Sequence, residues 1–194
     1  ALPARTAIVT LLLFSGIELS YAQSSFVKVS LAQGVSVELP AHWQTMSANK
    51  KATLQAWQES VNEKYKLKDV EHDLALVANN YDDDGFVVAS FAIRYYPTMD
   101  ITNSEAIAGG ASFIREVDEV VKQNFKAGLE AAGGKLIAWQ GTSRKIINGT
   151  SYFVSRNRTI SPRGEKFHGV LVRYLNAGKS FTIIMSYRDD QAFY

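Results

Sequence analysis

The chain has 194 residues, of which 46% are hydrophobic and 21% are charged, and its formal net charge is +2. This composition is typical of a globular protein with a sizeable core, and so small a net charge does not by itself predict a polyanionic partner. The chain contains no cysteine, which excludes a disulfide framework, a thiolate nucleophile and a cysteine-ligated metal.

The first 25 residues, ALPARTAIVTLLLFSGIELSYAQSS, have the layout of a secretory signal peptide. Arg5 supplies the positive charge, residues 7–17 form a short apolar run, and Ala22 precedes a cleavage point. That run is shorter than the roughly 20 residues that span a bilayer. We therefore expect a signal peptide over residues 1–22 and an exported protein, periplasmic or secreted, with no transmembrane segment after cleavage. A buried N-terminal helix is the alternative.

A strand and a helix are predicted next. Val35, Val37 and Leu39 alternate with polar residues up to Pro40, which is typical of a strand over 34–40. A helix is expected from Ser47, a suitable N-cap, to about residue 64. Its apolar residues recur at helical spacing, and they are Leu54, Trp57 and Val61.

Two strand-like runs follow, over residues 73–81 and 86–96, separated by Asp82–Gly85. An Asp-Gly step between apolar runs predicts a hairpin with a type I′ turn, in which both central residues have positive φ.

A long helix is predicted from about Thr102 to residue 132. Thr102 and Glu105 form a capping box, and Gly133–Gly134 end the helix. Its expected buried stripe consists of Ile107, Ile114, Val117 and Val121.

The remaining chain predicts an antiparallel meander. A turn at Asn148–Gly149 joins the first pair of strands. The four expected strands cover about 135–147, 150–160, 166–175 and 180–188. This order of elements predicts an α+β fold, an antiparallel sheet covered by helices, as a single domain over residues 23–194.

The triplet Gly178-Lys179-Ser180 resembles the end of a phosphate-binding loop. The first glycine of that motif would fall at Arg173, and a strand rather than a helix follows the triplet. We therefore predict a hairpin turn. Its register pairs Tyr174 with Phe181, Val172 with Ile183, Val170 with Met185 and His168 with Tyr187.

The sequence predicts no cofactor, metal or catalytic site. Asn80, Asp82 and Asp84 have the spacing of calcium ligands, but Phe91 stands where the bidentate glutamate belongs, and a solvated turn is the better interpretation. None of the three histidines has a metal-binding spacing. An enzyme of the hydrolase type, with an unrecognised site near one of them, is the alternative. These histidines are His42, His72 and His168.

Positive charge gathers in the last third of the chain. Residues 135–194 hold ten of the 21 lysines and arginines but three of the 19 acidic residues. A partner-binding face is hypothesised there, made of Arg144, Tyr152, Arg156, Arg158 and Arg173. Its partner would be an acidic envelope protein or an anionic surface such as lipid headgroups, and export argues against nucleic acid. Alternatively, the arginines are solvated or pair with the acidic helix residues Glu116, Asp118 and Glu119.

Three segments together resemble the PsbP-like group, which includes PsbP of photosystem II and the bacterial DcrB-like envelope proteins. They are Pro40-Ala41-His42-Trp43, Ile147-Asn148-Gly149 and the hairpin from Gly178 to Tyr187. The resemblance implies an α/β/α sandwich and a non-enzymatic accessory role. DcrB-like proteins typically carry a lipid-anchoring cysteine, which this chain lacks, and the group's final helix has no room after Tyr187, so a C-terminal truncation is expected.

The sequence thus predicts an exported, non-catalytic binding or accessory protein of the bacterial cell envelope. The alternatives are the envelope enzyme and a peripheral binder of anionic lipid.

Overall fold

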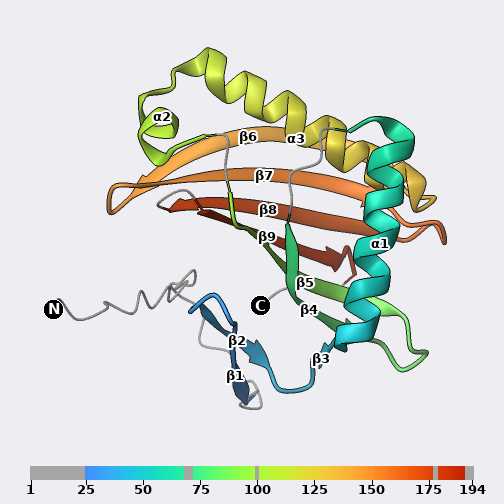
Figure 1. Ribbon diagram of the computed structural model, residues 1–194. Coiled ribbons are helices and arrows are strands. Elements are labelled where there is room, and N and C mark those ends of the chain that lie inside the picture. The colour runs from blue at the N-terminus through green and yellow to red at the C-terminus, as the bar shows by residue number, and fades with distance from the viewer. Residues whose placement is uncertain (1–24, 68–71, 99–100, 177–178, 191–194) are drawn as a thin grey trace, which may run out of the picture. The chain divides into compact units, whose positions relative to one another are not determined.

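A computed structural model describes residues 25–67, 72–98, 101–176 and 179–190 (Figure 1). The described residues fall into two compact units, which divide between residues 44 and 45. In the first unit, β1 (Phe26–Ser30) pairs antiparallel with β2 (Ser36–Pro40). The strand expected over 34–40 is confirmed, whereas its partner β1 was not predicted. The expected signal peptide lies outside the described residues.

The second unit contains a seven-stranded sheet with the order β3-β4-β5-β9-β8-β7-β6. Every ladder from β4 to β6 in this order is antiparallel, which confirms the predicted antiparallel α+β fold. The strands are β3 (Gln44–Thr45), β4 (Asp73–Tyr81), β5 (Val87–Tyr96), β6 (Lys135–Ile147), β7 (Thr150–Ile160), β8 (Lys166–Asn176) and β9 (Lys179–Arg188).

Three helices lie on one face of this sheet, as Figure 1 shows: α1 (Ala48–Tyr65), α2 (Asn103–Ala108) and α3 (Ala111–Ala131). The single helix expected over 102–132 is therefore wrong, because the chain leaves the helix at Gly109–Gly110. Gly109 has an extended ψ of 130°, and a Cβ there would lie 2.7 Å from Cγ of Phe113, so the close approach requires glycine. The capping box of Thr102 and Glu105 is confirmed.

Helix α1 begins after Ser47 as predicted, with the Ser47 hydroxyl accepting from Lys50 N at 3.4 Å. Of its three apolar residues at helical spacing, only Val61 is buried, whereas Leu54 and Trp57 are exposed. Hydrogen bonds attach α1 to the sheet instead. Lys51 Nζ donates to the carbonyl of Ala75 at 3.0 Å, and Gln55 Nε2 donates to the carbonyl of His72 at 3.1 Å.

The two predicted turns differ in geometry. Asn148 and Gly149 have φ of 50° and 72°, the two left-handed residues that a type I′ turn needs. In Asp82–Gly85 only Gly85 is left-handed, with φ of 80°, so a type I′ turn was the wrong prediction there. The loop is instead closed by Asp82 N donating to the carbonyl of Phe86 at 2.9 Å.

The predicted register of the last hairpin is confirmed in all four pairs, from His168–Tyr187 to Tyr174–Phe181. Lys179 already belongs to β9, so a strand follows the glycine-lysine-serine triplet, as expected of a hairpin and not of a phosphate loop. Residues 177–178 themselves lie outside the described part of the chain.

Because side chains alternate along each strand, the sheet has two distinct faces. The face that carries the helices, here called the helix face, contains a row formed by Arg94, Thr182, Arg173, Phe153 and Arg144. The opposite face, called the second face, contains the neighbouring row formed by Tyr95, Phe181, Tyr174, Tyr152 and Lys145. A hydrophobic cluster of Ala106, Phe153 and Leu175 closes the space between α2 and the helix face.

Candidate functional site

The structure divides the five residues of the hypothesised face between the two sides of the sheet. Tyr152, Arg156 and Arg158 alternate in step along β7 and share the second face. Arg173 pairs with Phe153, and Arg144 pairs with the same phenylalanine from the other side, so both arginines lie on the helix face. The five side chains therefore do not form one surface.

Arg144 has a structural role, because its guanidinium bonds to the end of α2. Its Nη1 donates to the carbonyl of Ala106 at 2.5 Å, to that of Ile107 at 3.1 Å and also to that of Gly109. These carbonyls belong to the C-terminal end of α2, where helix carbonyls lack partners within the helix. The guanidinium thus caps α2 and holds it against β6.

On the second face, Arg158 and Arg156 differ in their partners. Arg158 Nη2 lies 2.7 Å from Asp189 Oδ2, and His168 Nε2 lies 3.0 Å from Asp189 Oδ1. Arg156 is exposed and forms no ion pair within the described residues. Its positive charge is therefore available to a partner.

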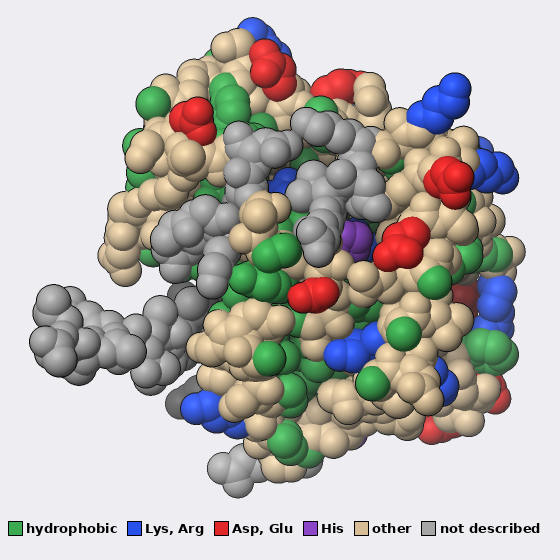
Figure 2. Space-filling model, in the orientation of Figure 1, with side chains coloured by type: hydrophobic (Ala, Val, Ile, Leu, Met, Phe, Trp, Pro, Cys, Tyr) green, Lys and Arg blue, Asp and Glu red, His purple; other side chains and the backbone are tan. Residues whose placement is uncertain are grey.

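Within the part of the chain that the structure describes, no arginine of the sheet forms an ion pair with the acidic run of α3. Asp118 accepts from Trp139 Nε1 at 2.8 Å, and Glu119 accepts from Gln123 at 3.0 Å. Figure 2 shows side chains of both signs on the face it draws. Arg188 of β9 pairs with Asp82 at 2.9 Å, so a basic residue of the last third of the chain meets an acidic residue from an earlier part.

The second face also carries a continuous row of four aromatic rings. The centroid of Tyr95 lies 5.1 Å from that of Phe181, Phe181 lies 6.4 Å from Tyr174, and Tyr174 lies 5.1 Å from Tyr152. Burial, as the larger cause, and the neighbouring Tyr174, as the smaller one, raise the pKa of the Tyr152 hydroxyl above its ordinary value. Lys145 ends the row on β6.

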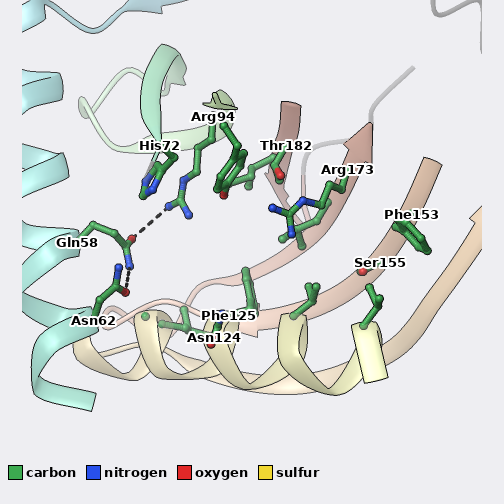
Figure 3. Close-up of a pocket in the computed structure, with 17 residues that line it drawn as sticks. Gln58, Asn62, His72, Arg94, Asn124, Phe125, Phe153, Ser155, Arg173 and Thr182 are labelled. Carbon is green, nitrogen blue, oxygen red and sulfur yellow. Dashed lines mark hydrogen bonds between the residues drawn. The ribbon is translucent and has the colours of Figure 1, made fainter. Parts of the chain in front are cut away.

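A cavity of about 340 Å³ lies between α1, α3 and the helix face (Figure 3). None of the described residues that line it is acidic. Its polar lining consists chiefly of Gln58, Asn62, His72, Arg94, Arg173 and Thr182. A second hollow of about 280 Å³ shares Phe125, Leu129, Leu171 and Ile184 with it.

Two arginines enter the first cavity. Arg94 Nη2 donates to Gln58 Oε1 at 3.2 Å, and Gln58 Nε2 in turn donates to Asn62 Oδ1 at 3.2 Å. The Arg173 guanidinium lies 4.7 Å from the ring centroid of Tyr96, a cation–π distance. Within the described residues, the Nε atoms of both arginines are buried and form no hydrogen bond.

Sequence reasoning missed this cavity. The hypothesised partner-binding face puts Arg173 on the same face of the sheet as Tyr152. The predicted pairing of Tyr174 with Phe181 already placed Tyr174 on one face of the sheet, and because side chains alternate along a strand, Arg173 must lie on the opposite face. Arg94 interrupts the apolar run FVVASFAIRYY, which was the available signal of a charge inside the fold.

The three histidines considered for metal binding or catalysis have different surroundings. His72 lines the cavity, His168 contacts Asp189, and His42 belongs to the first unit. The described residues contain no cluster of three or more side chains suited to a metal. Among the described residues, no helix is long and apolar enough to cross a membrane.

The Asp82 carboxylate has protein partners. It accepts from Phe86 N at 2.8 Å and from Arg188 Nη1 at 2.9 Å. The Phe86 hydrogen bond, and then the Arg188 hydrogen bond, lower the pKa of Asp82 below its ordinary value. Arg188 also bonds Asp190 at 2.7 Å, so the loop after β4 is tied to the end of β9.

Comparison with known proteins supports the fold. No protein family model matches the chain, and no curated protein matches it in sequence. The solution structure of cyanobacterial PsbP (CyanoP) from Synechocystis sp. PCC 6803 is similar, with a TM-score of 0.52 and 14% sequence identity, over 90% of this chain and 87% of that chain. PA94 from Pseudomonas aeruginosa matches over 84% of this chain and 83% of its own at 14% identity, but its TM-score of 0.35 is too low to support an argument. The chain therefore has the PsbP-like fold that its three sequence segments predicted.

Proposed function

We propose that the chain is an exported, non-catalytic accessory protein of the bacterial cell envelope, and that it binds an acidic protein through the second face. The likeness to cyanobacterial PsbP supports an accessory role, and the leader-like pattern of residues 1–22 supports export. The sequence contains no catalytic motif, which supports a binding role over an enzymatic one.

The observation that carries this proposal is the aromatic row beside an arginine without a carboxylate partner. Tyrosine and arginine are enriched at the energetic centres of protein interfaces. Tyr152 and Arg156 project from the same side of β7, separated by Val154. The three helices described here pack on the opposite face, so they do not cover this one.

Charge selects the class of partner. Lys145 and Arg156 are exposed, and neither forms an ion pair within the described residues, so an acidic segment is complementary to this surface. Arg158 contributes less, because Asp189 already neutralises it. Since the charges are exposed, binding should weaken as salt rises.

The test is photo-cross-linking in cells, with a photoreactive phenylalanine in place of Tyr152, followed by mass spectrometry and by binding of the purified pair. We expect one acidic protein to be captured, lost with Arg156→Glu and retained with Arg115→Glu, a matched charge reversal at an exposed residue of α3. Cell fractionation of the tagged chain tests export.

Two results would contradict the proposal. One is capture that Arg156→Glu leaves unchanged. The other is co-sedimentation with phosphatidylglycerol vesicles in the absence of any protein partner, which would make the second face a lipid-binding surface.

A further inference from the structure

The layer between α3 and the sheet is incompletely filled. Helix α3 turns an apolar stripe toward the sheet, yet none of its described residues is fully buried. Protein interiors are normally packed to crystal density, with few voids larger than a water molecule. Near α2, Phe113 and Val117 pack against Phe153 and close the layer. The hollow begins at Val117 and Phe153, which also line it, and extends under the half of α3 that contains Phe125 and Leu129.

The arginines of this hollow are placed by strand register. Arg94 pairs with Thr182, and Thr182 pairs with Arg173, so the two arginines lie two strands apart in one row. With neighbouring strands about 4.8 Å apart, their Cα atoms are about 10 Å apart, a span that one anionic group can bridge between two long side chains. Figure 3 shows both side chains projecting into the space between the sheet, α1 and α3.

Most of the hydrogen-bond donors of these two arginines are unused. A guanidinium has five N–H donors. Within the described residues, Arg94 forms one hydrogen bond, to Gln58, Arg173 forms none, and neither arginine forms an ion pair. Both arginines are half-buried and their Nε atoms are buried, so an anion in the cavity would supply acceptors and a compensating charge.

The lining combines polar side chains, among them Asn124 and Ser155, with apolar ones. Phe125, Leu129, Leu171 and Ile184 line both hollows and so connect the arginine end with the space near Pro162. A volume of about 340 Å³ falls at the low end of small-molecule sites, which span about 300–1,000 Å³. The occupant should therefore have a small charged head and a short apolar body.

We propose that this cavity binds an anionic amphiphile, with its carboxylate or phosphate head between Arg94 and Arg173 and its apolar chain under α3. Gln58 orients Arg94, and stacking on Tyr96 orients Arg173. The site lies on the opposite side of the sheet from Arg156, so it is independent of the proposed partner surface.

The test is isothermal titration calorimetry of the full chain with decanoate, decyl phosphate, decanol, decyltrimethylammonium and inorganic phosphate. We expect decanoate or decyl phosphate to bind at one site, and the stronger of the two identifies the head group. Decanol and inorganic phosphate should each bind about tenfold or more weakly, because each lacks one half of the interaction. The cation should not bind.

Variants locate the site. Arg94→Gln and Arg173→Gln should each weaken binding of the anionic probe by about tenfold or more, because each removes a charge-assisted contact. Arg156→Gln on the second face is the matched control and should leave binding unchanged. Gly128→Leu keeps both arginines but fills the cavity. Its Cβ would approach only Gln58, at an ordinary 3.9 Å, and leucine favours the helix more than glycine does, so this variant should fold and lose binding.

Several outcomes would overturn the inference. They are the absence of binding by both anionic probes, equal binding of decanol, equal binding of inorganic phosphate, and binding that survives Gly128→Leu. If an arginine variant fails to fold, Gly128→Leu still decides the question.

Discussion

Replacing Gly169 by alanine should destabilise the protein only while Asn157 is present. Asn157 on β7 pairs with Gly169 on β8, and its side chain lies on the helix face with 2% of the residue exposed. A Cβ at Gly169 would lie 2.9 Å from both Cγ and Nδ2 of Asn157 and still closer to Oδ1. Because these distances are shorter than real Cβ contacts, the amide would have to move.

The magnitude follows from the two states of residue 157. With Asn157 present, Gly169→Ala overpacks the site and should lower the free energy of unfolding by about 1–3 kcal/mol. With Asn157→Ala the obstruction disappears, and alanine in a strand should exceed glycine in stability by about 0.5–1 kcal/mol. The coupling energy should therefore be about 1.5–4 kcal/mol.

The assay is urea denaturation of the four members of this double-mutant cycle, followed by circular dichroism. Asn157→Ala alone should have a modest effect, because neither Oδ1 nor Nδ2 of Asn157 has a hydrogen-bond partner within the described residues. Effects that add to within about 0.5 kcal/mol would refute the reasoning, because they would show that the amide does not pack on Gly169.

Two further substitutions test other contacts. The hydrogen bond from Phe86 N, and to a smaller extent that from Arg188, lowers the pKa of Asp82 in the folded protein below the ordinary 3.8. The ionised carboxylate therefore stabilises the fold fully above pH 3.8, and this stabilisation is lost as the pH falls through the lower pKa of the folded state. Asp82→Asn should therefore reduce the difference between denaturation midpoints at pH 7 and pH 3, and an unchanged difference would contradict this. Arg144→Met should lower the free energy of unfolding by about 1.5–3 kcal/mol, because α2 loses a charged cap, whereas Lys145→Met on the exposed second face should change it by less than about 0.5 kcal/mol. Equal effects of these two substitutions in thermal denaturation would contradict the capping role.

Local signals predicted the order of the elements well. The strands of the meander and the pairing of Tyr174 with Phe181 follow from alternation and from turn residues, which act over a few positions. The capping box at Thr102 also depends on residues three positions apart. The same reasoning failed at Gly109–Gly110, because the apolar spacing continues across a break where Gly109 lies close to the ring of Phe113.

The candidate sites required information that no local pattern contains. Arg156 and Arg173 both lie in basic strands, yet the register between β7 and β8 places them on opposite faces. Arg94 is separated from Arg173 by 79 positions in the sequence and meets it only because β5 pairs with β9. The composition of the last third of the chain shows that it is positively charged. Which of these charges face a cavity depends on the topology of the sheet, which composition does not reveal.

The central claim is that the two faces of one sheet bind different anions. The most direct measurement is an NMR titration that follows the arginine Nε–H signals of the labelled chain with decanoate and, separately, with a polyglutamate peptide. We expect decanoate to move the signals of Arg94 and Arg173 and the peptide to move that of Arg156. Two results would contradict this: both ligands move the same arginine signals, or decanoate moves neither the Arg94 nor the Arg173 signal.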